Sequence, residues 1–189
     1  MGELAAGPDW AIVAMSLPEP AADGGVAALV RAARAGDPDA FEALYRRHHR
    51  LVHGVLLARL PRADAEDLAQ EVFLAAWERL ADLRSDEGFG GWLCAIARNR
   101  AASLARSRPR EAALPEDVPG GPRADEGPEA VLAAIRRLPE AYREPLVLRL
   151  VEGLSGPEIA RETGLTEGSV RVNLHRGFAK LRELLGGGR

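Results

Sequence analysis

The stretch from Leu154 to Leu185 constrains the fold of this chain most strongly, because its pattern predicts two helices joined by a tight turn. Pro157 suits a first helical position, where its missing N–H leaves no helical hydrogen bond unmade. Gly164 suits the left-handed residue that ends this helix. Thr166 then offers a side-chain oxygen that can cap the next helix. The stretch therefore predicts a helix-turn-helix.

The second of these helices has two contrasting faces. Its apolar residues recur at helical spacing and predict a buried stripe. They are Val170, Leu174, Phe178, Leu181 and Leu185. The opposite face carries Gly168, Ser169, Val172, His175 and Arg176, with Arg171 and Lys180 beside it. A cationic outer face on the second helix of such a pair is typical of a helix that enters the major groove of DNA.

An ordinary helical hairpin with solvated arginines is the alternative interpretation of this stretch. Two residues on the outer face favour DNA. Val172 lies in the middle of that face, where water is a poor neighbour but a thymine methyl group is a good one. Gly168 lowers helix stability but allows a phosphate to approach the backbone closely.

The net charge of −3 conceals an uneven distribution. Residues 1–25 carry a charge of −4 and residues 111–130 carry −5, so the rest of the chain carries +6. The acid thus lies in segments rich in Ala, Gly and Pro, whose composition is the least suited to folding. The segments with helical patterns are basic, as a nucleic-acid partner requires.

These patterns predict an all-α protein with two small helical domains joined by a flexible linker, the C-terminal domain being the helix-turn-helix. We expect a disordered tail over residues 1–24, in which Met15 is an alternative start to Met1, and a first domain over residues 25–108. Residues 109–128 contain five prolines and three glycines, which predicts an extended linker. The second domain would span residues 129–186. The helices are expected at 26–35, 37–60 with Asp37 as cap, 63–80 with Asp64 as cap, 91–107, 130–138 and 139–151.

The helix expected over residues 63–80 presents a row of carboxylates beside partly exposed aromatic side chains. Its buried stripe is Ala65, Leu68, Ala69, Val72 and Ala76. The other faces carry Asp64, Asp67, Gln70, Glu71, Phe73, Trp77 and Glu78. Acids in a first turn also favour the helix dipole, and that role alone is the simpler reading. The mixture of acids and aromatics is typical of a protein–protein contact.

The helix that follows ends in a strongly basic segment. Residues 98–110 contain five arginines and no acid, so this end of the helix must face an anionic partner or repel itself. The acidic, glycine-containing loop before it, over residues 81–91, is expected to be flexible. The polar side of the helix shows Arg98, Asn99, Ala102 and Arg106.

Neither a metal site nor a membrane segment is expected. His49 and His53 have the spacing of a metal-binding pair, but no HExxH pattern accompanies them, and His48 suits a core position. Cys94 is the single cysteine of the chain, which excludes an intrachain disulfide and a Cys-based zinc site, and it suits a small buried position. No apolar run approaches the roughly 20 residues that span a membrane. The short apolar run over residues 10–17 has no basic residue before it, so a cytoplasmic protein is expected.

With both halves in view, the chain resembles the extracytoplasmic-function (group IV) sigma factors of bacterial RNA polymerase, within the sigma-70 family. The segment DAEDLAQEVFLAAWERL is similar to the polymerase-binding helix of that family. The segment FGGWLCAIARNRAASLARSR is similar to its promoter-melting helix, and residues 138–185 are similar to its C-terminal domain throughout. The resemblance covers residues 26–185 apart from the linker.

The resemblance implies a role for each surface, with core RNA polymerase and promoter DNA as partners and no cofactor. The coiled coil of the largest polymerase subunit would be contacted by Asp64, Asp67, Gln70, Glu71, Phe73 and Trp77. The −10 promoter element would be read by the loop over residues 81–91, into which a base is flipped, and by Arg98, Asn99, Ala102 and Arg106. The −35 element would be read by Glu167, Ser169, Arg171, Val172, His175 and Arg176. The linker would thread toward the polymerase active-site channel.

The chain departs from the family at Val172 and Asn173, where a polar or basic pair is usual, and this affects the expected −35 preference. The family's usual inhibitor is an anti-sigma factor placed between the two domains, so such a partner is expected. The resemblance implies a protein that directs polymerase to promoters and helps to open the −10 region. No grouping of catalytic residues indicates an enzyme.

Two other functions remain open from the sequence. A conventional helix-turn-helix regulator would sense a ligand through its N-terminal domain and bind palindromic DNA without polymerase. A metal-dependent enzyme would use His49 and His53.

Overall fold

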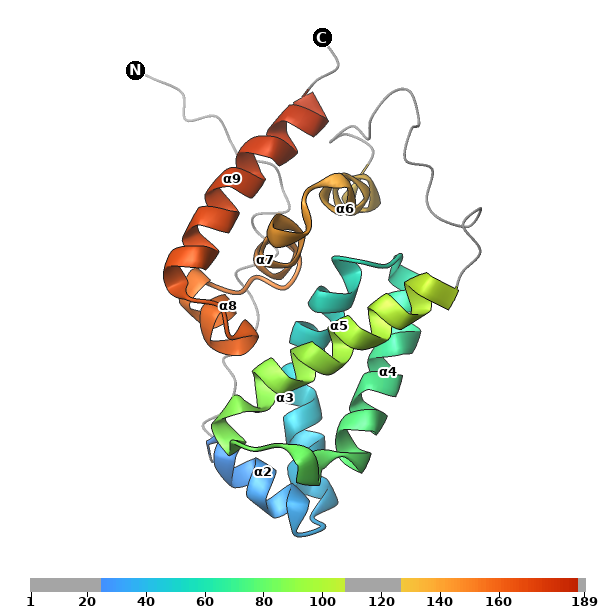
Figure 1. The fold of residues 1–189 in the computed structure, drawn as a ribbon, viewed down its shortest axis with the longest axis vertical. Coiled ribbons are helices and arrows are strands. Elements are labelled where there is room, and N and C mark those ends of the chain that lie inside the picture. Colours follow the sequence, from blue (N-terminus) through green and yellow to red (C-terminus); the bar gives the residue numbers. More distant parts are fainter. Residues whose placement is uncertain (1–24, 108–126, 187–189) are drawn as a thin grey trace.

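The structure is a computed structural model that describes residues 25–107 and 127–186. Within these ranges all regular secondary structure is helical, so the prediction of an all-α fold is confirmed. The expectations for the N-terminal tail, for Met15 and for most of the linker lie outside the described residues. The helices form two groups, one from α2 to α5 and one from α6 to α9 (Figure 1).

The N-terminal domain is built around α3, the helix that packs against α2, α4 and α5. Leu44, Val52, Val55 and Leu56 recur at helical spacing on α3 and are buried, and Phe41 on the same helix is partly buried. Cys94 on α5 is fully buried too, and burial raises the pKa of its thiol to about 12. The helices of this domain are α2 (Val26–Arg34), α3 (Pro38–Leu57), α4 (Arg62–Glu78) and α5 (Phe89–Ser107).

Local chemistry fixes where two of these helices begin. Asp37 caps α3 as predicted, because its carboxylate accepts hydrogen bonds from the N–H groups of Asp39 at 2.9 Å and Ala40 at 3.2 Å. The prediction that Asp64 caps α4 is wrong. Pro61 precedes the helix in an extended conformation, and its carbonyl already accepts from the N–H of Ala65 at 3.0 Å, so Asp64 lies inside the first turn.

The loop between α4 and α5 is more ordered than its composition predicts. It contains two short 3₁₀ turns, η1 (Leu80–Asp82) and η2 (Asp86–Gly88), and α5 begins at Phe89, a fully buried residue. Arg34 of α2 holds the loop: its Nε donates to the Leu80 carbonyl at 3.1 Å, and its Nη1 bonds Asp86 at 2.7 Å. Buried apolar side chains and a fixed arginine therefore replace the flexibility that the glycines suggest.

The C-terminal domain packs the last helix across α7 and α8. Gly177 of α9 allows a close approach, since a Cβ atom there would lie 3.0 Å from Leu146 Cδ1 and 3.2 Å from Tyr142 Cβ. Val170 and Leu181 of the expected apolar stripe are buried, and the other members are partly buried. The helices of this domain are α6 (Pro128–Arg137), α7 (Glu140–Leu150), α8 (Gly156–Thr163) and α9 (Glu167–Gly186).

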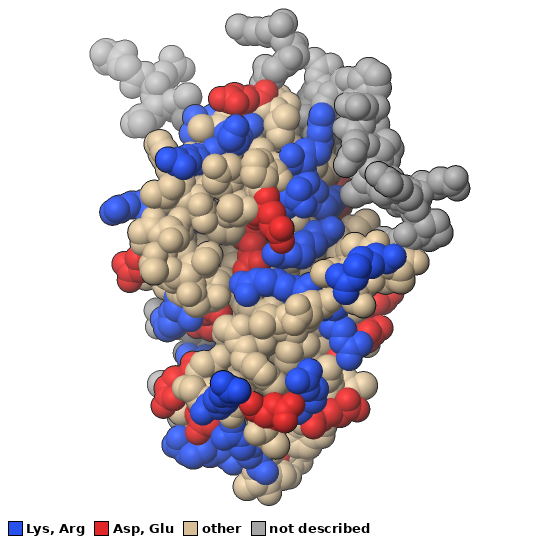
Figure 2. Space-filling view, viewed as in Figure 1, with Lys and Arg blue, Asp and Glu red and all other residues tan. Residues whose placement is uncertain are grey.

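The two domains pack directly on each other, α3 against α7 and α5 against α8. Figure 2 shows Lys and Arg side chains gathered with acidic ones in a band across the middle of one face, between the two helical groups of Figure 1. No pattern in the sequence indicates this packing. Of the described helices, none is long and apolar enough to cross a lipid bilayer.

Candidate nucleic-acid and polymerase interfaces

The helix-turn-helix is held by three local devices. Ser155 caps α8, and its side chain accepts a hydrogen bond from the N–H of Glu158 at 3.4 Å. Gly164 ends α8 in the left-handed conformation, with φ of 77°, as predicted. Thr166 Oγ1 accepts from the N–H of Ser169 at 3.1 Å, which confirms Thr166 as the cap of α9. Together these devices fix the direction in which α9 leaves the turn.

The outer face of α9 is exposed to solvent. Val172 is 42% exposed, and it is one of the few large apolar side chains among the described residues that face solvent. Val170, two residues earlier, is fully buried, so the helix is oriented as its pattern predicts. The side chains that the sequence places on or beside this face are all exposed: Glu167, Ser169, Arg171, Val172, His175 and Arg176.

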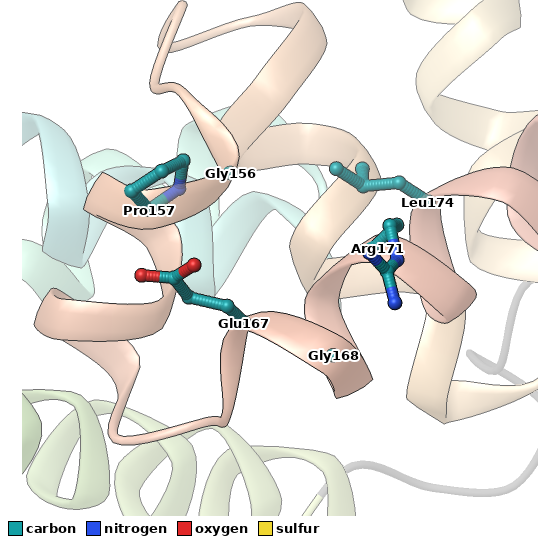
Figure 3. Close-up of a pocket in the computed structure, with 6 residues that line it drawn as sticks. All are labelled: Gly156, Pro157, Glu167, Gly168, Arg171 and Leu174. Atoms are coloured by element: carbon teal, nitrogen blue, oxygen red, sulfur yellow. The ribbon is translucent and has the colours of Figure 1, made fainter.

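A shallow hollow lies between the first turns of α8 and α9 (Figure 3). Gly156 and Pro157 form its α8 side, and the carboxylate of Glu167 points toward Pro157. Arg171 stands beside it on the next turn of α9. The hollow thus combines one acid, one base, two glycines that leave backbone accessible, and the apolar side chains of Pro157 and Leu174, next to the exposed face of α9.

The outer side of α4 is exposed in part. Asp67, Gln70, Glu71 and Trp77 are exposed, and Asp64 is half-buried. The expectation that Phe73 lies at an exposed edge is wrong. It is only 3% exposed, because its ring packs on that of Tyr45 from α3, with ring centroids 4.6 Å apart.

Leu74 is the member of the α4 surface that sequence reasoning missed. Its side chain is 60% exposed, more than any other large apolar residue among those described. It lies one helical turn after Gln70 and Glu71 and one turn before Trp77, so it stands in the centre of the acidic and aromatic surface. Its place on the helix is the signal that could have found it, because Leu74 follows the buried Val72 by two residues and so lies roughly 200° around the helix axis, on the side opposite the buried stripe.

The polar side of α5 is divided between two environments. Asn99, Ala102 and Arg106 are exposed, as predicted. Arg98 is not free: its Nε and Nη2 donate to the carboxylate of Glu144 on α7, at 3.1 and 2.6 Å. These hydrogen bonds raise the pKa of Arg98, so its guanidinium stays charged.

The histidines of α3 have structural partners. His48 is buried, and its Nδ1 lies 2.9 Å from the Leu44 carbonyl, as expected of a core histidine; burial lowers its pKa. His53 Nδ1 lies 3.1 Å from Glu152, which follows α7, and its ring stacks on that of His49. Among the described residues no three His, Cys, Asp or Glu side chains are grouped as a metal ion would require.

Comparisons with known proteins identify both domains. The family model described as Sigma-70 region 2 matches residues 44–111, and the one described as Sigma-70, region 4 matches residues 129–181. The sigma factor NccH of Alcaligenes xylosoxydans xylosoxydans is 36% identical over 84% of this chain and 93% of its own length. The sigma factor CarQ of Myxococcus xanthus is 38% identical over 81% and 93%.

Further similarities point to one group within that family. The ECF sigma factor SigM of Mycobacterium tuberculosis is 37% identical over 85% of this chain and 84% of its own length. The solved structure of CnrH in complex with the cytosolic domain of CnrY superposes with a TM-score of 0.60 and 29% identity, over 87% of this chain and 99% of that one. The chain therefore belongs to the extracytoplasmic-function sigma factors, the subunits that direct bacterial RNA polymerase to promoters.

Proposed function

We propose that three separate surfaces divide the work of this sigma factor: α4 binds core polymerase, α5 contacts the −10 element, and α9 reads the −35 element. The exposed outer face of α9 is the observation that carries the proposal. It brings together donors, acceptors and one apolar side chain on a helix whose opposite face is buried in its own domain. This is the arrangement that lets side chains reach base edges in a major groove.

At the −35 element, Arg171 and Arg176 supply positive charge on either side of Val172. Arginine binds guanine O6 and N7 with two hydrogen bonds, or a phosphate, and the Val172 methyl groups suit a thymine methyl group. Asn173, which follows Val172, is half-buried. The departure from the usual polar or basic pair therefore alters which base is preferred more than the way the helix docks.

At the −10 element, Asn99 is the side chain suited to read a base, because its amide both donates and accepts hydrogen bonds. Arg106, two turns later on the same side, and Arg98 would hold the phosphate backbone. The loop over residues 81–91 would receive a flipped base. Since Leu83 and Phe89 are buried, only its exposed members, such as Arg84, Ser85 and Glu87, could line such a site.

At the polymerase interface, Leu74 and Trp77 would form an apolar centre surrounded by Asp67, Gln70 and Glu71. Apolar and aromatic anchors inside a polar rim carry most of the binding energy of a protein interface. Phe73 would support this surface from below by packing, without direct contact. Asp64 would stand at its edge.

The activity would be recognition and strand opening without catalysis, in the cytoplasm where polymerase acts. An anti-sigma factor is the expected inhibitor, since CnrH, to which the chain is similar, is solved in complex with the cytosolic domain of CnrY. The two domains would be delimited at residues 25–108 and 129–186, with residues 109–128 as the linker that follows the path toward the active-site channel.

Selection of promoters by the reconstituted holoenzyme tests the proposal. The purified chain is mixed with core polymerase and a library of genomic DNA fragments, and the retained fragments are sequenced. We expect a shared pair of elements near −35 and −10, which appears only when both components are present, because tethering to polymerase supplies the effective concentration that each small domain lacks.

The matched controls are core polymerase alone and the chain alone. Specific retention of palindromic fragments by the chain alone would instead establish the conventional regulator. Loss of selection with Asp67→Arg but not with Arg137→Gln, an exposed arginine of α6 outside all three surfaces, would locate the polymerase interface on α4.

A further inference from the structure

The contact between the two domains is an array of ion pairs in which the N-terminal domain supplies the bases and the C-terminal domain the acids. Each pair joins residues that are far apart in the sequence. The arginine pairs are Arg50 with Glu152, Arg59 with Glu140 and Glu144, Arg62 with Glu129, and Arg98 with Glu144. Such one-sided charge complementarity favours one specific docking of the two domains.

Glu144 is the centre of this array. It is only 5% exposed, yet its carboxylate accepts hydrogen bonds from two arginines of the other domain. Arg59 donates through Nη1 at 3.0 Å, and Arg98 donates through Nε and Nη2 at 3.1 and 2.6 Å. A buried carboxylate is tolerated only with such partners, and removing them leaves an uncompensated charge. Separation of the two domains would therefore remove the partners of the Glu144 carboxylate.

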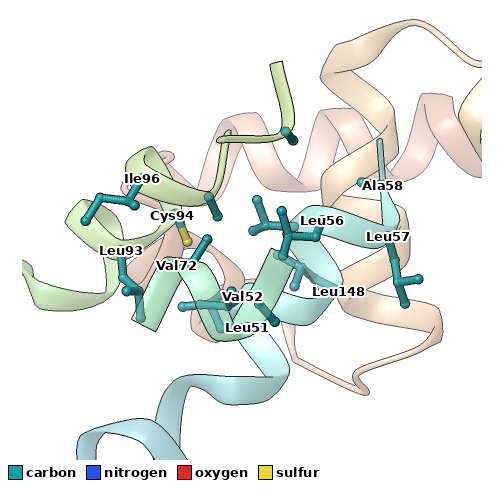
Figure 4. Close-up of a cluster of buried hydrophobic side chains, with 14 of the residues drawn as sticks. Leu51, Val52, Leu56, Leu57, Ala58, Val72, Leu93, Cys94, Ile96 and Leu148 are labelled. Atoms are coloured by element: carbon teal, nitrogen blue, oxygen red, sulfur yellow. The ribbon is translucent and has the colours of Figure 1, made fainter. Parts of the chain in front are cut away.

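Side chains of the C-terminal domain approach the backbone of α3 closely at the same contact. A Cβ atom at Gly54 of α3 would lie 2.6 Å from Leu148 Cδ2 and 2.9 Å from Glu152 Cγ, both on the C-terminal domain. Figure 4 shows Leu148 of α7 among Leu51, Val52 and Leu56 of α3, so the apolar core continues from one domain into the other. The contact is thus a fitted interface with an apolar centre and charged surroundings.

We propose that this interface holds the free protein in a closed form that withholds one residue of its −10 surface, Arg98, from DNA, because Glu144 occupies the Arg98 guanidinium in place of a phosphate. Asn99, Ala102 and Arg106 of that surface stay exposed. The inference rests on the proposed role of α5 in −10 recognition. A carboxylate and a phosphate offer the guanidinium the same geometry of two oxygen acceptors. A DNA strand must therefore displace Glu144 before Arg98 can bind it. Binding of polymerase and promoter to the two separated domains opens the closed form.

The closed form has a measurable cost for DNA binding. The apparent affinity of a ligand falls by the fraction of the protein that is competent to bind it. A free chain that is open about a tenth of the time binds DNA about tenfold more weakly than a chain that is always open. Variants that weaken the interface without touching the DNA surface therefore bind DNA more tightly than the natural chain.

Two variants of the full chain weaken the interface by different means. Glu144→Gln keeps the shape of the side chain but removes the charge that holds Arg59 and Arg98. Gly54→Ala places a methyl group against Leu148 and Glu152 and changes no charge. Alanine is a better helix former than glycine, so α3 itself gains stability from this change. Glu140→Gln is the matched control, because Glu140 also bonds Arg59 from α7, at 3.2 Å, but its side chain is 74% exposed and an exposed pair contributes little.

Two measurements follow each variant. Small-angle X-ray scattering gives the radius of gyration of the free chain, and fluorescence anisotropy gives its affinity for a single-stranded oligonucleotide with the selected −10 sequence. We expect Glu144→Gln and Gly54→Ala to enlarge the radius of gyration and to bind the oligonucleotide up to about tenfold more tightly. Glu140→Gln should match the natural chain in both.

Unchanged scattering and unchanged affinity in both variants would overturn the closed form. If a variant has a larger radius of gyration but the same affinity for the oligonucleotide, the closed form does not withhold Arg98 from DNA. Combining Glu144→Gln with Arg98→Gln should abolish the gain in affinity, and a gain that persists would contradict the role of Arg98. Promoter opening by the natural chain with core polymerase is measured separately, so its failure would count against the proposed function and not against the closed form.

Discussion

Ser155 and Glu158 cap each other at the start of α8: the Ser155 N–H donates to Glu158 Oε2 at 2.7 Å, and the Glu158 N–H donates to Ser155 Oγ at 3.4 Å. This reciprocal pair is a capping box, and it satisfies two backbone N–H groups that would otherwise lack partners. The helix that it begins is only eight residues long, and α9 follows it after a short turn. The cap therefore supports the orientation of the −35 surface.

The capping box makes the stability of the C-terminal domain depend on pH. Hydrogen bonds from Ser155 lower the pKa of Glu158 below its ordinary value of 4.5. A carboxylate with a lowered pKa contributes stability that is complete above the unfolded value and is lost as the pH falls through the folded value. We expect Glu158→Gln to lower the urea midpoint of unfolding at pH 7, as followed by circular dichroism. The midpoint of this variant should also fall less than that of the natural chain as the pH is lowered.

Glu183→Gln is the matched control, because Glu183 lies near the C-terminal end of α9, where a carboxylate gains nothing from the helix dipole. It should leave the urea midpoint at pH 7 unlowered. If the urea midpoint of Glu158→Gln falls in acid as much as that of the natural chain, the assigned cap is contradicted. Ser155→Ala should resemble Glu158→Gln at pH 7, with a loss of about 1 kcal/mol.

Two adjacent residues of α4 should separate folding from polymerase binding. Phe73→Ala removes a ring that is packed on Tyr45, and we expect it to lower the free energy of unfolding by about 3–5 kcal/mol. Leu74→Ala removes an exposed side chain and should leave unfolding nearly unchanged. It should nevertheless weaken the binding of core polymerase by about 2 kcal/mol, as loss of an interface anchor does.

Urea unfolding and titration of labelled chain with core polymerase measure the two effects. Asp67→Arg serves as a second surface variant, since Asp67 is exposed on the same side of α4. If Leu74→Ala and Asp67→Arg both bind core polymerase as the natural chain does, the polymerase interface lies elsewhere. If Phe73→Ala unfolds no more easily than Leu74→Ala, the packing of Phe73 contributes little.

Features that depend on nearby residues could be predicted from the sequence, and features that depend on distant ones could not. The caps at Asp37 and Thr166 and the left-handed Gly164 follow from the chemistry of a few consecutive residues, and the structure confirms each. The buried side of α9 follows from periodicity in the same way. The partner of Arg98 lies 46 residues away, across the linker, and no local pattern announces it.

The burial of Phe73 could not be predicted for the same reason. Helical spacing places it beside the buried stripe of α4, and only the ring of Tyr45 on α3 decides that this edge is covered. Asp64 does not cap α4 because the helix already begins at Arg62, directly after Pro61, and periodicity does not resolve a helix start to within two residues. The glycines of the loop before α5 suggest flexibility, but Leu83 and Phe89 anchor the loop in the core.

The recognition helix should discriminate bases through Val172 and Arg176. Arg176→Ala should weaken −35 recognition. Val172→Ser should change the preferred base at the position where Val172 contacts a thymine methyl group. Each base-reading side chain is worth about 1–3 kcal/mol of discrimination. Sequencing of promoters selected by the variant holoenzymes measures both effects.

Arg182→Ala is the control for this helix, because Arg182 is exposed near the C-terminal end of α9, away from the first turns that reach base edges. It should retain the −35 consensus of the natural chain. An unchanged consensus with Val172→Ser would mean that Val172 does not face the bases, and that its exposure has another cause.

Asn99 provides the sharpest test of strand opening. Its side chain is exposed on α5, one turn before Ser103 and two turns before Arg106, and its amide can both donate and accept hydrogen bonds. We expect Asn99→Ala to leave the affinity for core polymerase unchanged, because α4 is untouched, and to reduce the unpaired region at the −10 element. Permanganate footprinting of unpaired thymines measures the size and intensity of that region.

Arg106→Gln is the contrasting variant. A phosphate contact carries no sequence information, so its loss should weaken promoter binding by a similar factor on every sequence and should flatten the dependence on salt concentration. Asn99→Ala should instead act on opening at saturating DNA and leave the salt dependence unchanged. A bubble of normal intensity with Asn99→Ala would remove Asn99 from the mechanism. A bubble absent with the natural holoenzyme, on every promoter of a genomic library, would remove the −10 role from α5 altogether.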